Sequence, residues 1–239
     1  MKRHEPTILT FSGIDGAGKS TQIDALSRYL QECGHRVQLY TFWDDVVAFS
    51  RHREYLSLRA FRGEKGVGSP ERPITRRDKD VTSWYVLTLR LFLYVLDTFR
   101  LFAVVSDCAA EDVAFVIFDR YIYDELANLP LQHWPVRFYV RLLLQIAPKP
   151  DLAFLLDADP ESAISRKPEY PLAFVRKNRE TYLAISNLAR MFVLPPASVE
   201  TTILRIRELL SNLKADPETV PVEAPPHRFA ARGVQTPNS

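Results

Sequence analysis

The sequence predicts an α/β protein in which a five-stranded parallel sheet carries helices on both faces. Five short apolar runs have the length of strands, and stretches with helical periodicity separate them. This alternation is expected where each crossover between parallel strands is a helix. The runs at 114–118 and 152–156 are apolar throughout, which is typical of strands covered on both faces.

The elements follow in order along the chain. Strands are expected at 7–11, 37–42, 114–118, 152–156 and 191–194. Helices are expected from Lys19 to a cap at Gly34, and over 81–106, 136–146, 172–190 and 199–213. A further helix is expected to begin at Asp159 and Pro160, which fit an N-cap and a first helical turn.

Composition limits the classes of protein to consider. The apolar stretch from Leu89 contains Arg90, Asp97 and Arg100, so it predicts a buried helix and no membrane insertion. The N-terminus has no long apolar run typical of a secretory signal, and two cysteines suit a reducing cytoplasm. The five histidines show no metal-ligand spacing.

Residues 1–213 are interpreted as one domain, and 214–239, rich in proline, as a disordered tail.

The segment FSGIDGAGKSTQ, from Phe11, indicates a phosphate-binding loop. A strand, the pattern G-x4-G-K-S and a helix follow one another, which is the context that such a loop requires. Glycines let backbone N–H groups approach phosphate oxygens, and the helix N-terminus adds its dipole. Lys19 can reach the β- and γ-phosphates, and the Ser20 hydroxyl can bind Mg²⁺.

A bound Mg²⁺ also calls for a carboxylate at the end of a neighbouring strand. Asp119 follows the run AFVIF, and Asp157 follows LAFLL. Asp119 is favoured as the metal residue, whereas Asp157 and Asp159 are favoured as structural residues at the start of a helix.

The order FSGIDGAGKSTQ, FDRYIYDELA, PDLAFLLDADPESAISR and RETYLAI resembles the thymidylate kinase family over about residues 7–213. The resemblance implies a P-loop kinase three-layer sandwich. It also implies transfer of a phosphoryl group from ATP to a nucleoside monophosphate, with Mg²⁺. Asp15 would lie near the sugar of the acceptor, Asp119 would act on the metal or its waters, and Arg120 would bridge the donor and acceptor phosphates.

The resemblance places a lid over the donor at about residues 164–179. Arg166 is interpreted as functional, and Lys167 and Lys177 as solvated, while Arg176 and Arg179 fit either reading. The expected catalytic residues are Lys19, Arg120, Asp119 and Asp15. The expected ATP-binding residues are Gly13, Asp15, Gly16, Ala17, Gly18, Lys19, Ser20, Thr21, Arg166, Arg176 and Arg179.

The acceptor side departs from the family pattern. After the second strand a typical member has a stretch like R-E-P-G-G-T, where this chain has TFWDDVVAF, from Thr41. The family's base-stacking phenylalanine and base-reading arginine correspond to Tyr94 and Thr98. Candidate acceptor-binding residues are Trp43, Asp44, Tyr94, Arg90, Arg100 and Tyr123.

An acceptor-side insertion is expected at about 43–80. Its part at 51–79 holds nine Lys or Arg against four Asp or Glu, which suggests a polyanionic ligand or an ordinary solvated loop. Two alternatives to a thymidylate kinase-like enzyme therefore stay open: a polyphosphate-linked nucleotide kinase and a non-catalytic ATP-binding regulator. Basic residues in one segment alone argue against a nucleic-acid partner, and the apolar helix at 81–106 leaves a homodimer open.

Overall fold

The computed structural model describes residues 5–47 and 84–215, with side chains at 87–213 of the second range. The strands are β1 (Thr7–Ser12), β2 (Val37–Thr41), β3 (Phe115–Asp119), β4 (Leu152–Leu156) and β5 (Phe192–Leu194). The helices are α1 (Lys19–Glu32), α3 (Trp84–Ala110), α4 (Ile122–Leu126), α5 (Trp134–Ile146), α6 (Pro160–Arg166), α7 (Leu172–Ala189) and α8 (Val199–Ala215), with a short π-helix η1 (Phe42–Val46).

The five strands form one parallel sheet in the order β2-β3-β1-β4-β5. The chain moves outward from β1 to the edge strand β2, returns through β3 and then continues on the other side of β1. In open parallel sheets a ligand crevice forms at the carboxyl ends of the strands where the order reverses. The predicted five-stranded parallel sheet is confirmed, and β1 places the glycine loop at this reversal.

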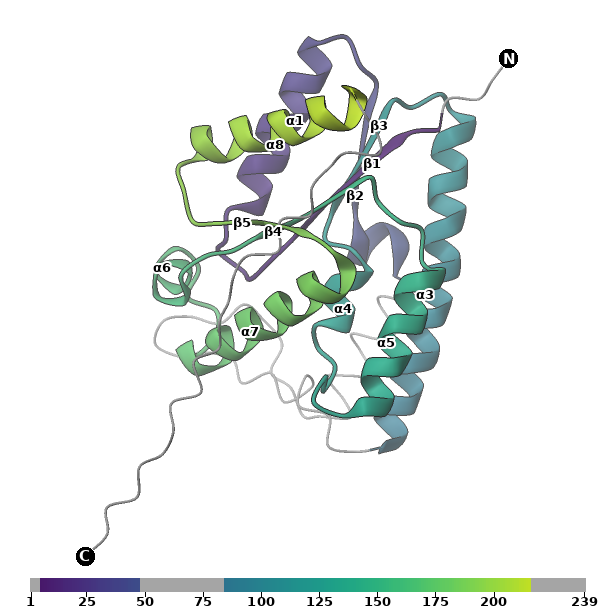
Figure 1. Ribbon diagram of the computed structural model, residues 1–239, viewed down its shortest axis with the longest axis vertical. Helices are drawn as coiled ribbons and strands as arrows, with labels where there is room; N and C mark the ends of the chain where they lie inside the picture. The colour runs from purple at the N-terminus through teal and green to yellow at the C-terminus, as the bar shows by residue number, and fades with distance from the viewer. Residues whose placement is uncertain (1–4, 48–83, 216–239) are drawn as a thin grey trace, which may run out of the picture.

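Alternating side chains of the strands build two hydrophobic cores, one on each face of the sheet. Leu9, Phe11 and Phe154 pack with α1 and α8. Ile8, Phe118 and other strand residues pack with helices α3, α4, α5 and α7 on the opposite face. Figure 1 shows these helix layers on either side of the strands. The sheet is therefore covered on both faces, as the continuous apolar runs predict.

Several element boundaries differ from the sequence predictions. Phe42 was expected to end the second strand but begins η1. Its ring is fully buried near Tyr121. The chain also turns here because the Asp45 carboxylate accepts a hydrogen bond from the Thr41 amide at 2.7 Å. Helix α4 was not predicted, since five residues are too few to show a helical period. The start of α6 is confirmed, because Asp159 Oδ2 accepts a hydrogen bond from the Ser162 amide.

Two predicted segments lie largely outside the described residues, namely the insertion at about 43–80 with its basic part 51–79, and the tail at 214–239. The predicted domain boundaries therefore stay predictions. No helix in the described part of the chain combines the length and apolar character that crossing a membrane requires.

Candidate active site

The glycine loop joins the carboxyl end of β1 to the start of α1. Gly13 has a φ of +144° and Gly16 a φ of +83°, conformations that residues with a side chain rarely adopt. A Cβ atom on Gly13 would lie 2.5 Å from the Leu156 carbonyl oxygen, and one on Gly16 would lie 2.5 Å from that of Ala163. Glycine is therefore required at both positions, because the loop packs directly against the backbone at β4 and α6.

Helix α1 begins at Lys19, so its N-terminus and the Lys19 ammonium group belong to the same site. Lys19 is only 7% exposed, and Nζ donates hydrogen bonds to the carbonyl oxygens of Gly13 at 2.9 Å and Ile14 at 3.0 Å. Burial, followed by the nearby charge of Arg120, lowers the pKa of Lys19 to about 8. The loop thus holds a lysine that loses its proton more easily than an exposed lysine does, and a bound anion would favour its charged form.

Asp119 ends β3 and lies on the same cavity as Ser20. Burial raises the pKa of the Asp119 carboxyl group, while the charges of Lys19 and Arg120 oppose this rise. Its Oδ1 atom is buried and has no hydrogen-bond partner. A hydroxyl and a carboxylate are oxygen ligands of the type that Mg²⁺ prefers, and this ion is commonly held by one or two protein groups plus substrate phosphates. Ser20 and Asp119 therefore fit such an ion, although no group of three possible ligands occurs among the described residues.

Arg120 adopts a left-handed backbone conformation with a φ of +69°. Its amide donates to the Phe11 carbonyl oxygen at 2.9 Å, which ties the end of β3 to β1. The guanidinium group forms a close ion pair with Asp15 of the glycine loop, and Nη1 lies 3.6 Å from Asp124 Oδ1. The structure therefore brings together Asp15 and Arg120, which are 105 residues apart in sequence.

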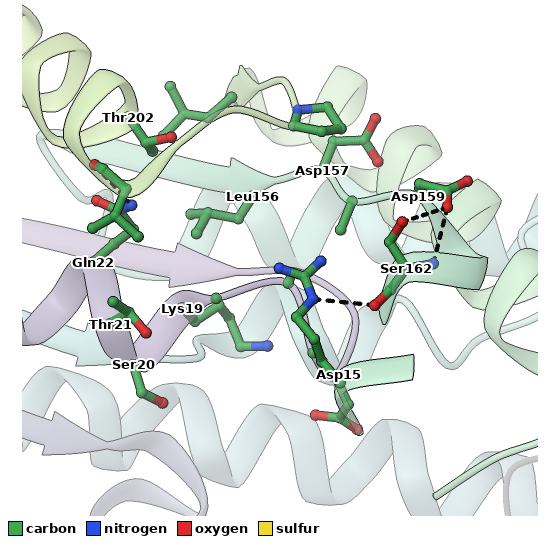
Figure 2. Close-up of a pocket in the computed structure, with 18 of the residues that line it drawn as sticks. Asp15, Lys19, Ser20, Thr21, Gln22, Leu156, Asp157, Asp159, Ser162 and Thr202 are labelled. Atoms are coloured by element: carbon green, nitrogen blue, oxygen red, sulfur yellow. Dashed lines mark hydrogen bonds between the residues drawn. The ribbon is translucent and has the colours of Figure 1, made fainter. Parts of the chain in front are cut away.

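A cavity of about 920 Å³ lies at the carboxyl edge of the sheet, and its wall includes Asp15, Lys19 and Arg120. In Figure 2, Asp15, Lys19 and Ser20 lie on one side of the cavity, and Asp157, Asp159 and Ser162 lie on the other. The predicted residues on the cavity are Asp15, Gly16, Ala17, Gly18, Lys19, Ser20, Thr21, Asp119, Arg120 and Arg166. The structure thus places all four predicted catalytic residues and both predicted metal residues around one space.

The predicted lid arginines divide into two groups. Arg166 lines the cavity, and its Nε donates to the Ser162 carbonyl oxygen at 3.1 Å. Arg179 binds both oxygens of Asp157 at 2.6 Å, and Arg176 pairs closely with Glu161. Neither Arg176 nor Arg179 is among the residues that line the described cavity, so their contact with ATP stays a prediction.

The predicted acceptor residues lie away from this cavity in the described part of the chain. Tyr94 and Tyr123 are buried in the core, at 3% and 6% exposure. Arg100 donates to the carbonyl oxygens of Asp45 and Val47 and so ties α3 to η1. Trp43 and Asp44 are exposed on η1, and Arg90 is half-buried on α3. Their contact with an acceptor stays a prediction, because much of the expected acceptor region lies outside the described residues.

The sequence interpretation missed part of the cavity wall. Lys167, read as solvated, lines the cavity, as do the segment after β5 and Thr202 of α8. The predicted parallel sheet could have indicated these residues, because the carboxyl ends of neighbouring parallel strands meet at one edge of the sheet. The residues that follow β5 belong to the site for this reason.

A glycine loop with its lysine, and an aspartate-arginine pair ending the adjacent strand, define a P-loop nucleotide-binding protein of the α/β class. No protein-family model matches the chain. Over 176 residues it is 31% identical to the thymidylate kinase of Chlorobaculum parvum, which covers 70% of each chain. It is 26% identical over 217 residues to a probable thymidylate kinase of Archaeoglobus fulgidus, covering 87% of this chain and 97% of the relative.

The fold agrees with these relatives. The crystal structure of thymidylate kinase from Ehrlichia chaffeensis matches with a TM-score of 0.54 at 19% identity, over 87% of this chain and all of that chain. The chain belongs to the thymidylate kinase family.

Proposed function

We propose that this protein transfers the γ-phosphoryl group of ATP to dTMP or a closely related nucleoside monophosphate. The observation that carries this proposal is the placement of Lys19, Ser20, Asp119 and Arg120 around one cavity at the start of α1. The relatives called thymidylate kinase support the same substrate class. They favour this function over the polyphosphate-linked kinase and the non-catalytic regulator.

In the proposed reaction an acceptor phosphate oxygen bonds to the γ-phosphorus of ATP as the bond to the β,γ-bridging oxygen breaks, leaving ADP. Loop amides and Lys19 bind the donor phosphates, and Arg120 neutralises charge on the group in transfer. Ser20 and Asp119 would hold Mg²⁺, which supplies further neutralisation of the phosphates. Asp15 keeps Arg120 beside the loop through their ion pair.

The acceptor side is proposed to lie beyond Asp15 and Arg120, toward η1. Trp43 offers an exposed ring for stacking, and Asp44 an exposed carboxylate for polar contacts. Arg100 supports η1 from α3. These residues would determine which monophosphate is accepted, since the family's usual phosphate-gripping stretch is replaced here.

A coupled assay of ADP release tests the function. It would use ATP with dTMP, dUMP, dCMP, dGMP and polyphosphate as separate acceptors. We expect turnover with dTMP or a close relative, and loss of at least about a hundredfold in the Lys19→Ala variant. Turnover only with polyphosphate would favour the alternative kinase, and binding of ATP without any turnover would favour the regulator.

We also propose a homodimer. Helices α3 and α5 lie side by side, joined by a hydrogen bond of 2.6 Å from Tyr139 Oη to the Leu91 carbonyl oxygen (Figure 1). Both helices carry exposed large apolar side chains: Leu89, Phe92, Phe99 and Phe102 on α3, and Trp134, Phe138, Leu142 and Ile146 on α5. Eight exposed large apolar side chains on two neighbouring helices are more than the scattered single residues of an ordinary surface, and a second copy that presents the same helices is a matching partner.

Sedimentation velocity tests the dimer with Phe99→Glu and Phe138→Glu, which place charges in the apolar face. Leu204→Glu on α8 is the matched control, since Leu204 is also a large apolar residue and its exposure of 61% is close to that of Phe99 and Phe138. We expect monomer in the first two variants and dimer in the control. A wild-type monomer at tens of micromolar would contradict the proposal.

The two cysteines are free thiols, which agrees with the cytoplasmic location that the sequence predicts.

A further inference from the structure

Asp124 is a buried carboxylate next to the site that does not itself line the cavity. It lies in α4, is 3% exposed, and accepts hydrogen bonds on both oxygens. Oδ2 accepts from Ser12 Oγ at 2.6 Å and from the Tyr121 amide at 3.0 Å, and Oδ1 accepts from Tyr182 Oη at 2.7 Å. A buried carboxylate is tolerated when donors surround it, and these donors also restrict its orientation.

The carboxylate is placed so that it acts on Arg120. The amide that it binds belongs to Tyr121, so it holds the peptide that follows Arg120. This hydrogen bond therefore restrains the backbone of Arg120, whose left-handed conformation is uncommon for residues other than glycine. Oδ1 also lies 3.6 Å from Arg120 Nη1, while Nη2 pairs with Asp15. The guanidinium group is therefore held between a carboxylate on the cavity and a carboxylate behind it.

Tyr182 connects this arrangement to α7. It is 4% exposed and lies three residues after Arg179, which binds Asp157 on the cavity wall. Residues three apart lie on neighbouring positions of a helix surface. One side of α7 therefore contacts the site twice, at Asp157 through Arg179 and at Asp124 through Tyr182.

We propose that Asp124 and Tyr182 are positioning residues for Arg120. The Tyr182 hydroxyl donates to Asp124 Oδ1 and so fixes the position of this oxygen, which lies 3.6 Å from Arg120 Nη1 on the side away from the Asp15 pair. Through the same contact, the position of α7 determines the position of Arg120. This inference rests on the proposed phosphoryl transfer, because Arg120 is the residue whose placement it explains.

The variant Tyr182→Phe removes the hydroxyl and keeps the ring. We expect kcat to fall about tenfold with KM for ATP changed less than about twofold, because Arg120 acts most strongly on the charge that develops during transfer. Tyr139→Phe is the matched control, since it also removes a tyrosine hydroxyl that donates to an oxygen, but on α5. We expect it to leave kcat unchanged.

A double-mutant cycle separates positioning from a general loss of stability. In an Arg120→Lys background, Tyr182→Phe should lower kcat by less than about twofold, because the group that it positions is already altered. Equal losses in both backgrounds would overturn the proposal, as would unchanged kcat in the single variant. Asp124→Asn keeps one acceptor oxygen and replaces the other with an NH2 group that cannot accept from its present donor, so it should also lower kcat with little change in KM for ATP.

A readout that does not depend on turnover keeps this inference distinct from the proposed function. The guanidinium NMR signals of Arg120, assigned by their loss in Arg120→Lys, should be resolved in the wild type and in Tyr139→Phe. They should shift or broaden in Tyr182→Phe. Unchanged signals would overturn the inference even if dTMP is a substrate, and shifted signals without turnover would place the failure in the proposed function.

Discussion

Lys19 donates its hydrogen bonds to carbonyl oxygens of its own loop, and its burial and the charge of Arg120 favour the neutral amine. The same residue is expected to bind ATP phosphates, for which it needs its charge. Binding an anion favours the charged form of Lys19, so the affinity of the loop for phosphate is coupled to the binding of a proton.

The first prediction concerns the pH dependence of ATP binding. With a pKa of about 8, Lys19 is mostly charged at pH 7 and mostly neutral at pH 9 in the free protein. Because binding at pH 9 must include uptake of a proton, we expect the affinity for ATP to fall about tenfold between these pH values. Isothermal titration calorimetry measures this change. In Lys19→Arg the guanidinium group keeps its charge, so an equal fall in that variant would contradict the assignment.

Gly16 carries the second prediction at this scale. Gly16→Ala would place a Cβ atom 2.5 Å from a backbone oxygen of α6, at a φ of +83°. Gly34→Ala has nearly the same φ, +80°, but no atom within 4 Å of the added carbon. We expect Gly34→Ala to cost about 1 kcal/mol of unfolding free energy and Gly16→Ala about 2–4 kcal/mol. Urea denaturation of both variants measures the difference, and equal losses would show that the contact with α6 relaxes freely.

At the scale of elements, α7 is attached to the cavity wall by pairs of different burial. Arg179 binds Asp157, whose side chain is 12% exposed, through two hydrogen bonds. Arg176 binds Glu161, where both side chains are more than half exposed. Water competes with the second pair far more than with the first, so the two ion pairs are not equivalent.

The third prediction compares these pairs. We expect Arg179→Ala to lower the unfolding free energy by about 1–2 kcal/mol. This is less than for a fully buried pair, because Arg179 is itself 37% exposed. Arg176→Ala should cost about 0–1 kcal/mol. Thermal and urea denaturation of both variants check the order, and a larger loss for Arg176→Ala would contradict it.

For the whole molecule, two cores on opposite faces of one sheet hold the site in place. Phe154 of β4 is fully buried, with its ring centroid 5.2 Å from that of Phe11 and 6.3 Å from that of Phe192. It therefore joins three neighbouring strands beneath α1 and α8. The same strands place the glycine loop and the wall of the cavity.

The fourth prediction concerns this core. Phe154→Ala should lower the unfolding free energy by about 3–5 kcal/mol, because it removes a buried ring and leaves a cavity. The control Leu204→Ala, at an exposed position of α8, should change it by less than about 0.5 kcal/mol. Calorimetric melting and urea denaturation test both values. A loss below about 1 kcal/mol for Phe154→Ala would show that the core refills the space.

Local patterns account for the features predicted correctly. The run LAFLL predicted β4 with its observed bounds, and the Asp159–Pro160 pair predicted the start of α6. Spaced glycines before Lys19 predicted the loop and the helix that follows. Each of these signals acts within a few residues, through backbone conformation, capping or alternation of apolar side chains, so it can be read without the fold.

The sequence by itself thus determined the class of fold, the phosphate loop and the aspartate-arginine pair at the end of β3. Only the tertiary structure decided the strand order and the partners of Arg120. Ser12 and Tyr182 reach Asp124 from 112 and 58 residues away. Such contacts depend on which strands become neighbours and where α7 packs, and these choices follow from burial over the whole molecule. The segment FDRYIYDELA predicted the roles of Asp119 and Arg120, but only the packing of α7 against α4 brings the Tyr182 hydroxyl to Asp124.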